Sequence, residues 1–301
     1  MNHVTRVAFI GLGVMGYPMA GHLARAGYRV VVFNRDPDKS RRWVAEYGGE
    51  ASTAAARATP GAHAVFCCLG NDQSVREVVL GENGVLAAME PGAVLVDHTT
   101  ASAALACELE RMAALRSIGF VDAPVSGGQA GAQKGILTVM AGGSAESFAS
   151  IEPMLGAYAR SARLIGAAGA GQLAKMVNQI CIAGVLQGLA EGLHFGRAAG
   201  LDMQAVIEVI CAGAAQSWQM ENRHRTMLAG EYRHGFAVDW MRKDLGMVLE
   251  EARRNGASLP VTALVDQFYA EVQALGGGRW DTSSLLARLE RATADDTKDR
   301  G

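Results

Sequence analysis

The first candidate for chemistry is a glycine-rich loop near the start of the chain. It directly follows an apolar run at 7–10 and opens a helical pattern, which is the context that phosphate binding requires. In such a loop the first glycine permits a tight turn, the second lets the backbone approach a pyrophosphate, and the third lets the helix pack on the strand. The helix start adds unpaired N–H groups for the phosphates, so the loop predicts a dinucleotide cofactor. The loop consists of Gly11, Leu12, Gly13, Val14, Met15 and Gly16.

The residues after the second apolar run, at 30–33, indicate which dinucleotide binds. A site for NAD commonly has Asp or Glu there, about 20 residues after the glycine motif, to bind the ribose 2′-hydroxyl. This chain has Asn34 at that position, followed by Arg35. A guanidinium can pair with a 2′-phosphate, so the sequence predicts NADP as the preferred cofactor, with NAD as the alternative. If the register is shifted by two residues, Asp36 is the ribose ligand instead.

Three further motifs follow in order along the chain. Residues 122–128 read DAPVSGG, residues 169–179 read GAGQLAKMVNQ, and residues 243–245 read KDL. Together with the glycine loop, this set resembles the 3-hydroxyisobutyrate dehydrogenase family, also called the β-hydroxyacid dehydrogenases, which has 6-phosphogluconate dehydrogenase as a larger relative. The resemblance implies an oxidoreductase that transfers a hydride between a nicotinamide cofactor and a small β-hydroxyacid or its semialdehyde.

The resemblance implies that residues 126–128 hold the carboxylate of the substrate. The chemistry agrees with that role, because Ser126 offers a hydroxyl and the N–H groups of Gly127 and Gly128 can form an anion-binding nest. The alternative is a glycine-rich turn with no ligand.

The resemblance also identifies Lys175 as the catalytic residue. Oxidation of a hydroxyl requires removal of its proton, and reduction of the carbonyl requires a proton donor. An amine can serve both steps when burial and nearby positive charge bring its pKa toward neutrality. Asn178 and Gln179 lie one turn along the same helical face and are expected to meet the same substrate. Lys243, which the resemblance puts beside cofactor and substrate, is a candidate for the nearby charge.

Other positions are assigned less directly. Trp218 is expected to wall the substrate pocket, with a core or interface role as the alternative. The family commonly has Asn where this chain has Gln179, and often Leu-Pro at positions 69 and 70, so the identity of the substrate stays open. The remaining residues expected to contact the cofactor are Leu69, Gly70, Ser74 and Thr100.

The elements that must position these residues fall into two groups. Short apolar runs alternate with helix-length stretches in the first half, which predicts an α/β fold with a doubly wound parallel sheet of the Rossmann type. The second half is predicted to be all helical, joined by a long interdomain helix at 172–199. The predicted domains are 1–165, which binds the dinucleotide, and 166–301, for substrate and dimerisation. The predicted strands lie at 7–10, 30–33, 64–69, 94–96, 119–122, 137–141 and 163–165.

Glycine recurs every fourth residue along the long helix, at Gly184, Gly188, Gly192 and Gly196. Each glycine costs a helix about 1 kcal/mol relative to alanine, so a backbone is expected to pack closely against this stripe. A subunit or domain interface and close packing within one subunit are both open. The family resemblance implies a homodimer or homotetramer.

Composition bounds the class of protein. Half of the 301 residues are apolar, 19% are charged and the net charge is −2, so a sizeable core is expected and nucleic acid is not an expected partner. The most apolar stretch, at 180–190, is shorter than the ~20 residues of a membrane span, so no membrane partner is expected. Five cysteines without CxxC spacing favour reduced thiols, no metal site and a cytoplasmic location, and no signal peptide is recognised.

Two other functions are compatible with the predicted fold. Imine reductases resemble this architecture but usually replace the catalytic lysine. A non-catalytic NADP-binding module would typically have lost it too. Lys175 and the intact loop at 126–128 argue against both alternatives.

Overall fold

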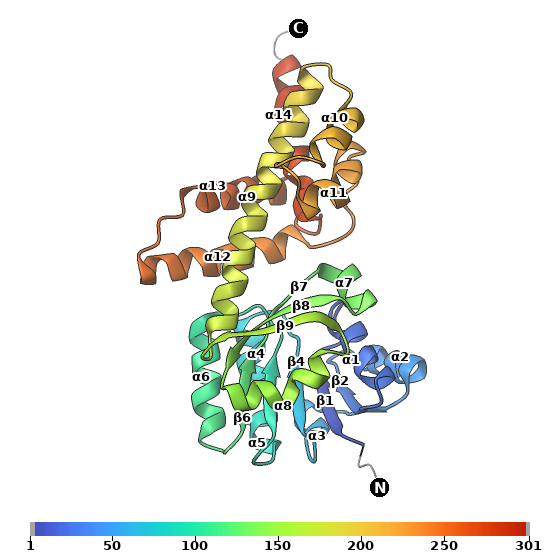
Figure 1. Ribbon diagram of the computed structural model, residues 1–301, viewed down its shortest axis with the longest axis vertical. Helices are drawn as coiled ribbons and strands as arrows, with labels where there is room; N and C mark the ends of the chain where they lie inside the picture. The colour runs from blue at the N-terminus through green and yellow to red at the C-terminus, as the bar shows by residue number, and fades with distance from the viewer. Residues whose placement is uncertain (1–3, 299–301) are drawn as a thin grey trace. The chain divides into compact units, whose positions relative to one another are not determined.

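The computed structural model describes residues 4–298. By their contacts the residues form two compact units, Met1–Lys175 and Met176–Gly301 (Figure 1). The predicted domain boundary at 165 coincides with the end of the strand Ala159–Gly166, whereas the units divide inside the long helix that follows.

The first unit is built on a nine-stranded sheet within the described residues, in the order β3-β2-β1-β4-β5-β6-β8-β7, with β9 pairing β8. The strands from β3 to β6 are parallel, β8 runs antiparallel to β6 and β7, and β9 is parallel to β8. The strands are β1 (Arg6–Ile10), β2 (Arg29–Phe33), β3 (Glu50–Ala51), β4 (Ala64–Cys67), β5 (Val94–Asp97), β6 (Gly119–Asp122), β7 (Val125–Ser126), β8 (Leu137–Gly143) and β9 (Ala159–Gly166).

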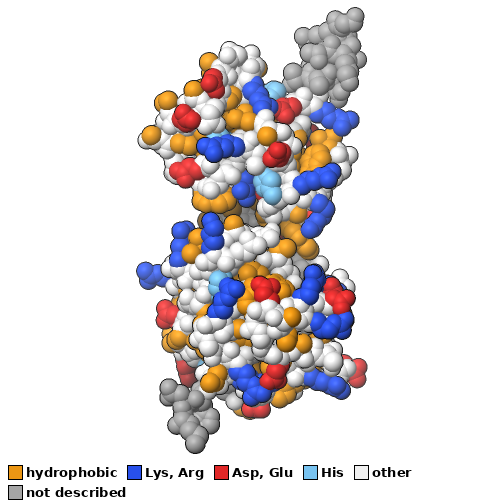
Figure 2. All heavy atoms as spheres, turned by 90° about the vertical axis from the view of Figure 1, so that its right-hand side faces the viewer, with side chains coloured by type: hydrophobic (Ala, Val, Ile, Leu, Met, Phe, Trp, Pro, Cys, Tyr) orange, Lys and Arg blue, Asp and Glu red, His pale blue; other side chains and the backbone are white. Residues whose placement is uncertain are grey.

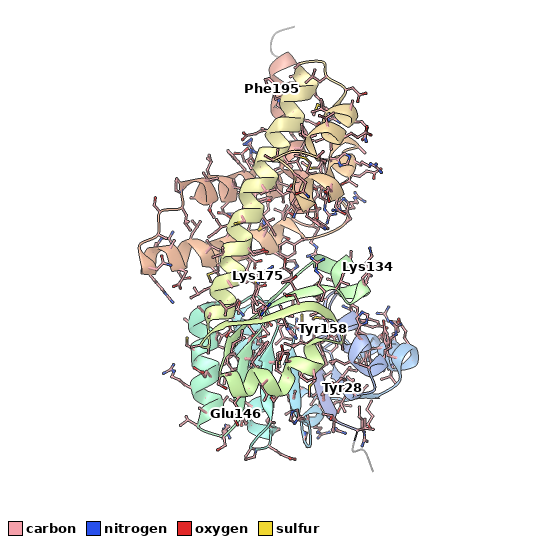
Figure 3. The ribbon with its side chains drawn as sticks, viewed as in Figure 1. Tyr28, Lys134, Glu146, Tyr158, Lys175 and Phe195 are labelled. Atoms are coloured by element: carbon pink, nitrogen blue, oxygen red, sulfur yellow. The ribbon has the colours of Figure 1, made fainter. Side chains whose placement is uncertain are left out.

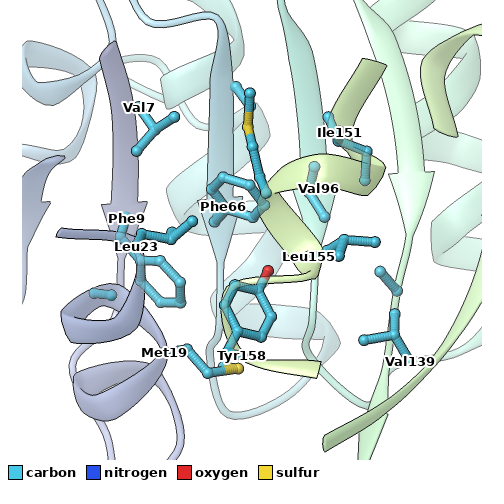
Figure 4. Close-up of a cluster of buried hydrophobic side chains, with 14 of the residues drawn as sticks. Val7, Phe9, Met19, Leu23, Phe66, Val96, Val139, Ile151, Leu155 and Tyr158 are labelled. Atoms are coloured by element: carbon cyan, nitrogen blue, oxygen red, sulfur yellow. The ribbon is translucent and has the colours of Figure 1, made fainter. Parts of the chain in front are cut away.

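Helices cover both faces of this sheet because successive side chains of each strand point to opposite faces. Val7 and Phe9 of β1 enter one core with α1, α2 and α8, while Ala8 and Ile10 enter a second core with α3 to α6. Figure 4 shows the first core, in which the ring of Tyr158 lies among aliphatic side chains. The helices are α1 (Gly16–Arg25), α2 (Pro37–Tyr47), α3 (Ala55–Ala58), α4 (Asp72–Leu80), α5 (Val85–Ala88), α6 (Ala103–Ala114), α7 (Gly128–Lys134) and α8 (Ala145–Leu155).

The second unit is helical and has its own core. Apolar residues of α9 between Ala183 and Leu193 pack with side chains of every later helix in this unit. The helices are α9 (Ala170–Ala198), which begins in the first unit, α10 (Met203–Ile210), α11 (Trp218–Leu228), α12 (Val238–Asn255), α13 (Pro260–Ala274) and α14 (Leu285–Lys298), with a 3₁₀ turn at Thr282–Ser284 before α14.

The predicted fold class is confirmed, and each predicted strand has a counterpart. The two strands that were missed, β3 and β7, contain two residues each, which is too short for any alternation of apolar and polar residues to show. The second half of the chain is all helical, as predicted.

The structure corrects one argument about α9. The helix has 29 residues and is long and apolar enough to cross a membrane, so the apolar stretch was wrongly judged too short. This is weak evidence for a span, because a core helix of a soluble protein passes the same test, and 44% of its most apolar window is buried. On the face shown in Figure 2, basic and acidic side chains are interspersed.

The glycine stripe of α9 is only partly explained by packing within the chain. A Cβ added at Gly196 would lie 2.1 Å from Met203 Sδ, so the flexible Met203 side chain would have to move to admit a side chain there. At Gly184, Gly188 and Gly192 a Cβ would meet no atom within 4 Å. Close packing inside the subunit therefore bears on one of the four glycines only, and the interface interpretation of the stripe stays a prediction.

Candidate functional site

The glycine loop joins β1 to α1 and contains two positions that only glycine can occupy. Gly11 has a φ of 101°, and a Cβ there would lie 2.3 Å from the carbonyl oxygen of Cys68. A Cβ at Gly16 would lie 2.0 Å from the carbonyl oxygen of Gly11. At Gly13, by contrast, a Cβ would meet no atom within 4 Å. The space beside Gly13 is therefore open to a ligand, and the backbone N–H groups at the start of α1 fit a pyrophosphate group.

Asn34 directly follows β2 and braces the glycine loop. Its Oδ1 accepts a hydrogen bond from the N–H of Leu12 at 3.0 Å, and its Nδ2 donates to the carbonyl oxygen of Asp36 at 3.1 Å. The carboxylate of Asp36 accepts from the N–H of Asp38 and so caps α2. Arg35, which lies between them in the sequence, is exposed. In the glycine loop Val14 is exposed and Met15 is partly buried. The chain thus presents Arg35 as a cation at the end of β2, while Asp36 has a local structural partner.

The other predicted cofactor residues lie after β4 and β5. The N–H of Leu69 donates to the hydroxyl of Thr99 at 2.9 Å. The N–H of Gly70 donates to the hydroxyl of Ser74 at 3.2 Å, and Ser74 also completes the capping box of α4. Thr100 is partly buried. Since β4 and β5 continue the parallel order from β1, these residues and the glycine loop share the carboxyl edge of the sheet, where α/β folds bind ligands.

The loop predicted to hold a carboxylate leaves β7. Ser126 pairs in register with Thr138 of β8 and is partly buried. Gly127 and Gly128 have φ values of 129° and 62°, and α7 begins at Gly128. Two successive residues with positive φ explain why this sequence has glycine at both positions.

Lys175 lies near the beginning of α9 (Figure 3) and is 7% exposed. The helix start is fixed by a buried side chain one turn earlier. Gln172 accepts from the N–H of Ala101 at 3.0 Å through Oε1 and donates to the carbonyl oxygen of Thr99 at 2.8 Å through Nε2. Both partners belong to the segment after β5, so the first turn of α9 is attached to the carboxyl edge of the sheet.

Two buried carboxyl groups end the neighbouring strands β5 and β6. Asp97 accepts from the N–H of Thr99 at 2.9 Å, and Asp122 accepts from the N–H groups of Gly169 and Gln172 at 2.7 and 2.8 Å. Burial raises the pKa of Asp97 to about 7 and that of Asp122 to about 6, although the hydrogen bonds from backbone N–H groups oppose the rise. The negative charge of Asp122 adds to the increase at Asp97. Asp97, His98, Asp122 and Gln172 are called the sheet-edge cluster below.

His98 of this cluster is buried. Its Nδ1 lies 2.6 Å from the carbonyl oxygen of Ala123 and its Nε2 lies 2.8 Å from the hydroxyl of Tyr158. The ring stacks on Phe66 with 5.8 Å between centroids. Burial lowers the pKa of His98 to about 4. The imidazole is therefore a neutral structural group near neutral pH.

In the second unit, four of the residues form a chain of side-chain contacts between α9 and α12. Asn178 Nδ2 donates to Gln179 Oε1 at 2.8 Å, and Gln179 Nε2 donates to Asp244 Oδ2 at 2.7 Å. Lys243 Nζ lies 3.2 Å from Asp244 Oδ1. Because a carboxylate beside an ammonium accepts hydrogen bonds, it sets the direction of the Gln179 amide, which in turn sets that of Asn178. These four residues are called the α9–α12 cluster.

Trp218 begins α11 and is half exposed. The guanidinium of Arg223 lies over its ring, 5.0 Å from the centroid. Its role in a substrate pocket stays a prediction. Among residues 4–291, whose side chains the structure describes, His, Cys, Asp and Glu do not gather in any group of three or more that could hold a metal ion.

Four residues that organise these regions had been given no role from the sequence. Asp122 and Gln172 stand inside motifs that were recognised, at the end of a buried strand and one turn before Lys175. Asp97 also ends a buried strand, and a strand-end carboxylate is a signal that could have been used. Asp244 directly follows Lys243 in the third motif, and the sequence offers no sign that Gln179 would reach it.

Comparison with protein families divides the chain in two. Residues 6–169 match the family described as the NAD binding domain of 6-phosphogluconate dehydrogenase. Residues 169–289 match the family described as NAD-binding of NADP-dependent 3-hydroxyisobutyrate dehydrogenase. Both matched segments meet at Gly169, where α9 is about to begin.

Similar proteins span almost the whole chain. An uncharacterized oxidoreductase of Shewanella frigidimarina is 62% identical, covering 96% of this chain and 99% of the relative. A probable 3-hydroxyisobutyrate dehydrogenase-like protein of Arabidopsis thaliana is 38% identical (95% and 86% covered), and the 2-(hydroxymethyl)glutarate dehydrogenase of Eubacterium barkeri is 34% identical (97% and 97%).

Solved structures of similar fold also cover almost the whole chain. A 3-hydroxyisobutyrate dehydrogenase from Salmonella typhimurium has a TM-score of 0.84 at 30% identity, covering 94% of this chain and 99% of that one. The structure of Psf3 in complex with NADP⁺ and 2-OPP has a TM-score of 0.85 at 26% identity, covering 94% of this chain and 99% of that one.

Proposed function

Since the chain belongs to the 3-hydroxyisobutyrate dehydrogenase family of hydroxyacid dehydrogenases, we propose that it oxidises a small β-hydroxyacid, or reduces its semialdehyde, with NADP(H) and with Lys175 as general acid and base. Membership of this family means that the protein is an oxidoreductase that binds NAD(P). The observation that carries the finer proposal is the burial of Lys175 on a helix whose first turn is fixed to the carboxyl edge of the sheet.

The residues of the glycine loop fit a dinucleotide. The open space at Gly13 and the N–H groups at the start of α1 would hold the pyrophosphate, and Arg35 would pair with a 2′-phosphate. When bound, the nicotinamide supplies the hydride chemistry, and the protein supplies binding, orientation and proton transfer.

The remaining steps belong to side chains of this protein. Ser126, with the N–H groups of Gly127 and Gly128, would bind the carboxylate of the substrate and so fix where its hydroxyl lies. The unprotonated amine of Lys175 would take the hydroxyl proton as the alcohol is oxidised, and the ammonium would return it in the reverse direction. Asn178 would contribute an amide to the same substrate.

The assignment of Lys175 is tested by Lys175→Ala, with Lys134→Ala as the matched control because Lys134 is an exposed lysine of the same unit. We expect Lys175→Ala to reduce kcat by roughly 1,000-fold, since proton transfer is lost, while NADPH affinity changes little. The assay follows nicotinamide absorbance with 3-hydroxyisobutyrate, 2-(hydroxymethyl)glutarate, serine, and tartronate and succinic semialdehydes. Near-normal turnover by the variant would refute the role of Lys175, and turnover of a cyclic imine but of no hydroxyacid would refute the substrate class.

Preference for NADP rests on Arg35 at the end of β2 and on the local partner of Asp36, the N–H of Asp38. Arg35→Ala is expected to lower kcat/KM for NADPH by about 10- to 100-fold, the usual value of a charge-assisted contact, and to leave kcat/KM for NADH nearly unchanged. Arg41→Ala, which removes an exposed arginine of α2, is the control. A wild-type enzyme that strongly prefers NADH would contradict the assignment.

The quaternary state belongs to the same proposal. Val177 and Phe195 on α9 are 60% and 72% exposed, which supports a homodimer or homotetramer. Light scattering on the purified protein measures the mass, and a monomer at micromolar concentration would remove this part. A cytoplasmic location, with a small carboxylate as the partner rather than a membrane or nucleic acid, is likewise proposed.

A further inference from the structure

We infer that Asp122 is a positioning residue for the catalytic lysine: its carboxylate fixes the first turn of α9 against the end of β6, so that the amine of Lys175 is held in one place. This inference rests on the proposed role of Lys175. The role of Asp122 differs from that of the loop that follows it. Ser126, Gly127 and Gly128 are proposed to bind substrate, and Asp122 is not.

Both oxygens of Asp122 are used on the helix. Oδ1 accepts from the N–H of Gly169 at 2.7 Å, and Oδ2 accepts from the N–H of Gln172 at 2.8 Å. The first N–H groups of a helix have no partner within the helix, so a carboxylate at this place satisfies two of them and favourably meets the positive end of the helix dipole. The residue is fully buried, which leaves the carboxylate no water as an alternative partner.

Glycines allow the strand and the helix to come this close. A Cβ at Gly171 would lie 2.5 Å from the carbonyl oxygen of Met140 and 2.6 Å from that of Asp122. A Cβ at Gly142 would lie 2.6 Å from Asp122 Oδ1 and 2.7 Å from the N–H nitrogen of Gly171. The contact between β6, β8 and the start of α9 is therefore made by backbone and one carboxylate, with no room for another side chain.

A second attachment makes the position of the helix definite. Gln172 bonds the segment after β5 at Thr99 and Ala101, while Asp122 holds the same turn from β6. Two attachments from neighbouring strands fix the first turn of α9 both along the helix axis and in rotation about it. Lys175 follows Gln172 by three residues, so its Cα is placed by this turn and not by the rest of α9.

The carboxylate also acts through its charge. The pKa of Asp122 is raised to about 6, chiefly by burial, so the group is ionised above that pH. Its negative charge contributes to the raised pKa values of Asp97 of β5 and Cys107 of α6. Asp122 Oδ2 accepts from the N–H of Gln172, one turn before Lys175 on the same helix. A negative charge at this place favours the ammonium form of Lys175, so its removal should move the pH limb of the lysine to lower pH.

The experiment compares Asp122→Ala and Asp122→Asn with Ser144→Ala. Ser144 accepts from the N–H of Ser147 at 3.1 Å and caps α8, a helix of the same unit that carries none of the proposed site residues. Each protein is assayed at a temperature where circular dichroism shows it folded. We expect kcat to fall by about 100-fold in Asp122→Ala, the cost of a misplaced catalytic group, with NADPH affinity within about twofold of wild type. In Asp122→Asn, the limb of kcat/KM assigned to Lys175 should shift to lower pH, whereas Ser144→Ala should lower Tm and leave kcat unchanged.

Two results would overturn the inference. One is wild-type kcat in folded Asp122→Ala or, if that variant does not fold, in Asp122→Asn. The other is an unshifted pH limb in Asp122→Asn, which would show that the residue acts on stability alone. Lys175→Ala separates this failure from that of the proposed function: if it is inactive while Asp122→Ala is fully active, only the positioning role is wrong, and if it is active, the role of Lys175 itself is wrong.

Discussion

The site residues of the two units are held in different ways. In the first unit, the carboxyl and amide groups of the sheet-edge cluster bind backbone: Asp97 and Asp122 accept from N–H groups, and Gln172 bonds one N–H and one carbonyl oxygen. In the second unit, the α9–α12 cluster binds side chain to side chain, from Asn178 through Gln179 to Asp244.

This difference affects how each region tolerates change. A backbone partner is supplied by the fold whatever residue stands there, so the side chain that meets it has few substitutes. A side-chain partner can change together with its neighbour. Gln179 is an example: its amide reaches Asp244, whereas the Asn that the family commonly has at this position would be too short to make the same contact. We therefore expect cofactor and proton chemistry to be fixed in the first unit and substrate preference to be adjustable in the second.

Among the variants that test this difference between the units, the largest effect is expected in the glycine loop. In Gly16→Ala the new methyl group would lie 2.0 Å from the Gly11 carbonyl oxygen, so the loop must move. Overpacking of this kind costs about 3 kcal/mol of folding free energy, and displaced N–H groups should weaken NADPH binding by roughly 100-fold or more. Thermal melting and NADPH fluorescence titration measure the two effects.

Gly13→Ala is the matched control, because a Cβ there meets no protein atom within 4 Å. It should keep the wild-type Tm and still lose NADPH affinity, since the methyl group occupies the space proposed for the pyrophosphate. Equal NADPH affinity in Gly13→Ala and wild type would show that the space beside Gly13 does not hold the pyrophosphate.

The next effect is the dependence of stability on pH that Asp97 introduces. Its pKa is about 7 in the folded protein and about 4 in the unfolded chain, so the folded state alone keeps the proton between these values. The stability contribution of Asp97 must therefore fall as pH rises from about 4 to about 7 and stay constant above that, by an amount on the order of 4 kcal/mol. Urea unfolding of wild type and Asp97→Asn across this range measures it as a difference, in which the opposite trend from His98 cancels. Parallel curves would contradict the prediction.

The smallest effect is expected in the α9–α12 cluster. Gln179→Asn shortens the side chain by one methylene, so the 2.7 Å bond to Asp244 is lost, at about 1 kcal/mol of folding free energy. We expect kcat/KM to change by about 10-fold and the order of preferred hydroxyacids to change with it. Gln187→Asn, at another buried glutamine of α9 that bonds Glu191, should alter stability only. An unchanged substrate order in Gln179→Asn would mean that this cluster is structural.

The sequence predicts the residues that bind backbone better than it predicts contacts between side chains. The turn at Gly11 and the approach at Gly16 are backbone requirements, and they leave glycine at readable spacings. The boundaries of β6 and the position of Lys175 on a helix were predictable for the same reason. The bond from Gln179 to Asp244 joins residues 65 positions apart through flexible side chains, and no local pattern encodes it. Asp122 was visible within a motif, but its partner, the start of α9, lies 47 residues further on.

The two hydrogen bonds of His98 have one last consequence. The carbonyl oxygen of Ala123 can only accept, so the ring proton must sit on Nδ1, and Nε2 must accept from the hydroxyl of Tyr158. The chemistry of its neighbours thereby selects one tautomer and leaves no lone pair for an added proton. The imidazole cannot become a counter-ion for Asp97 or Asp122 while this arrangement lasts, so the partners seen for these two carboxyl groups are the N–H groups of Thr99, Gly169 and Gln172.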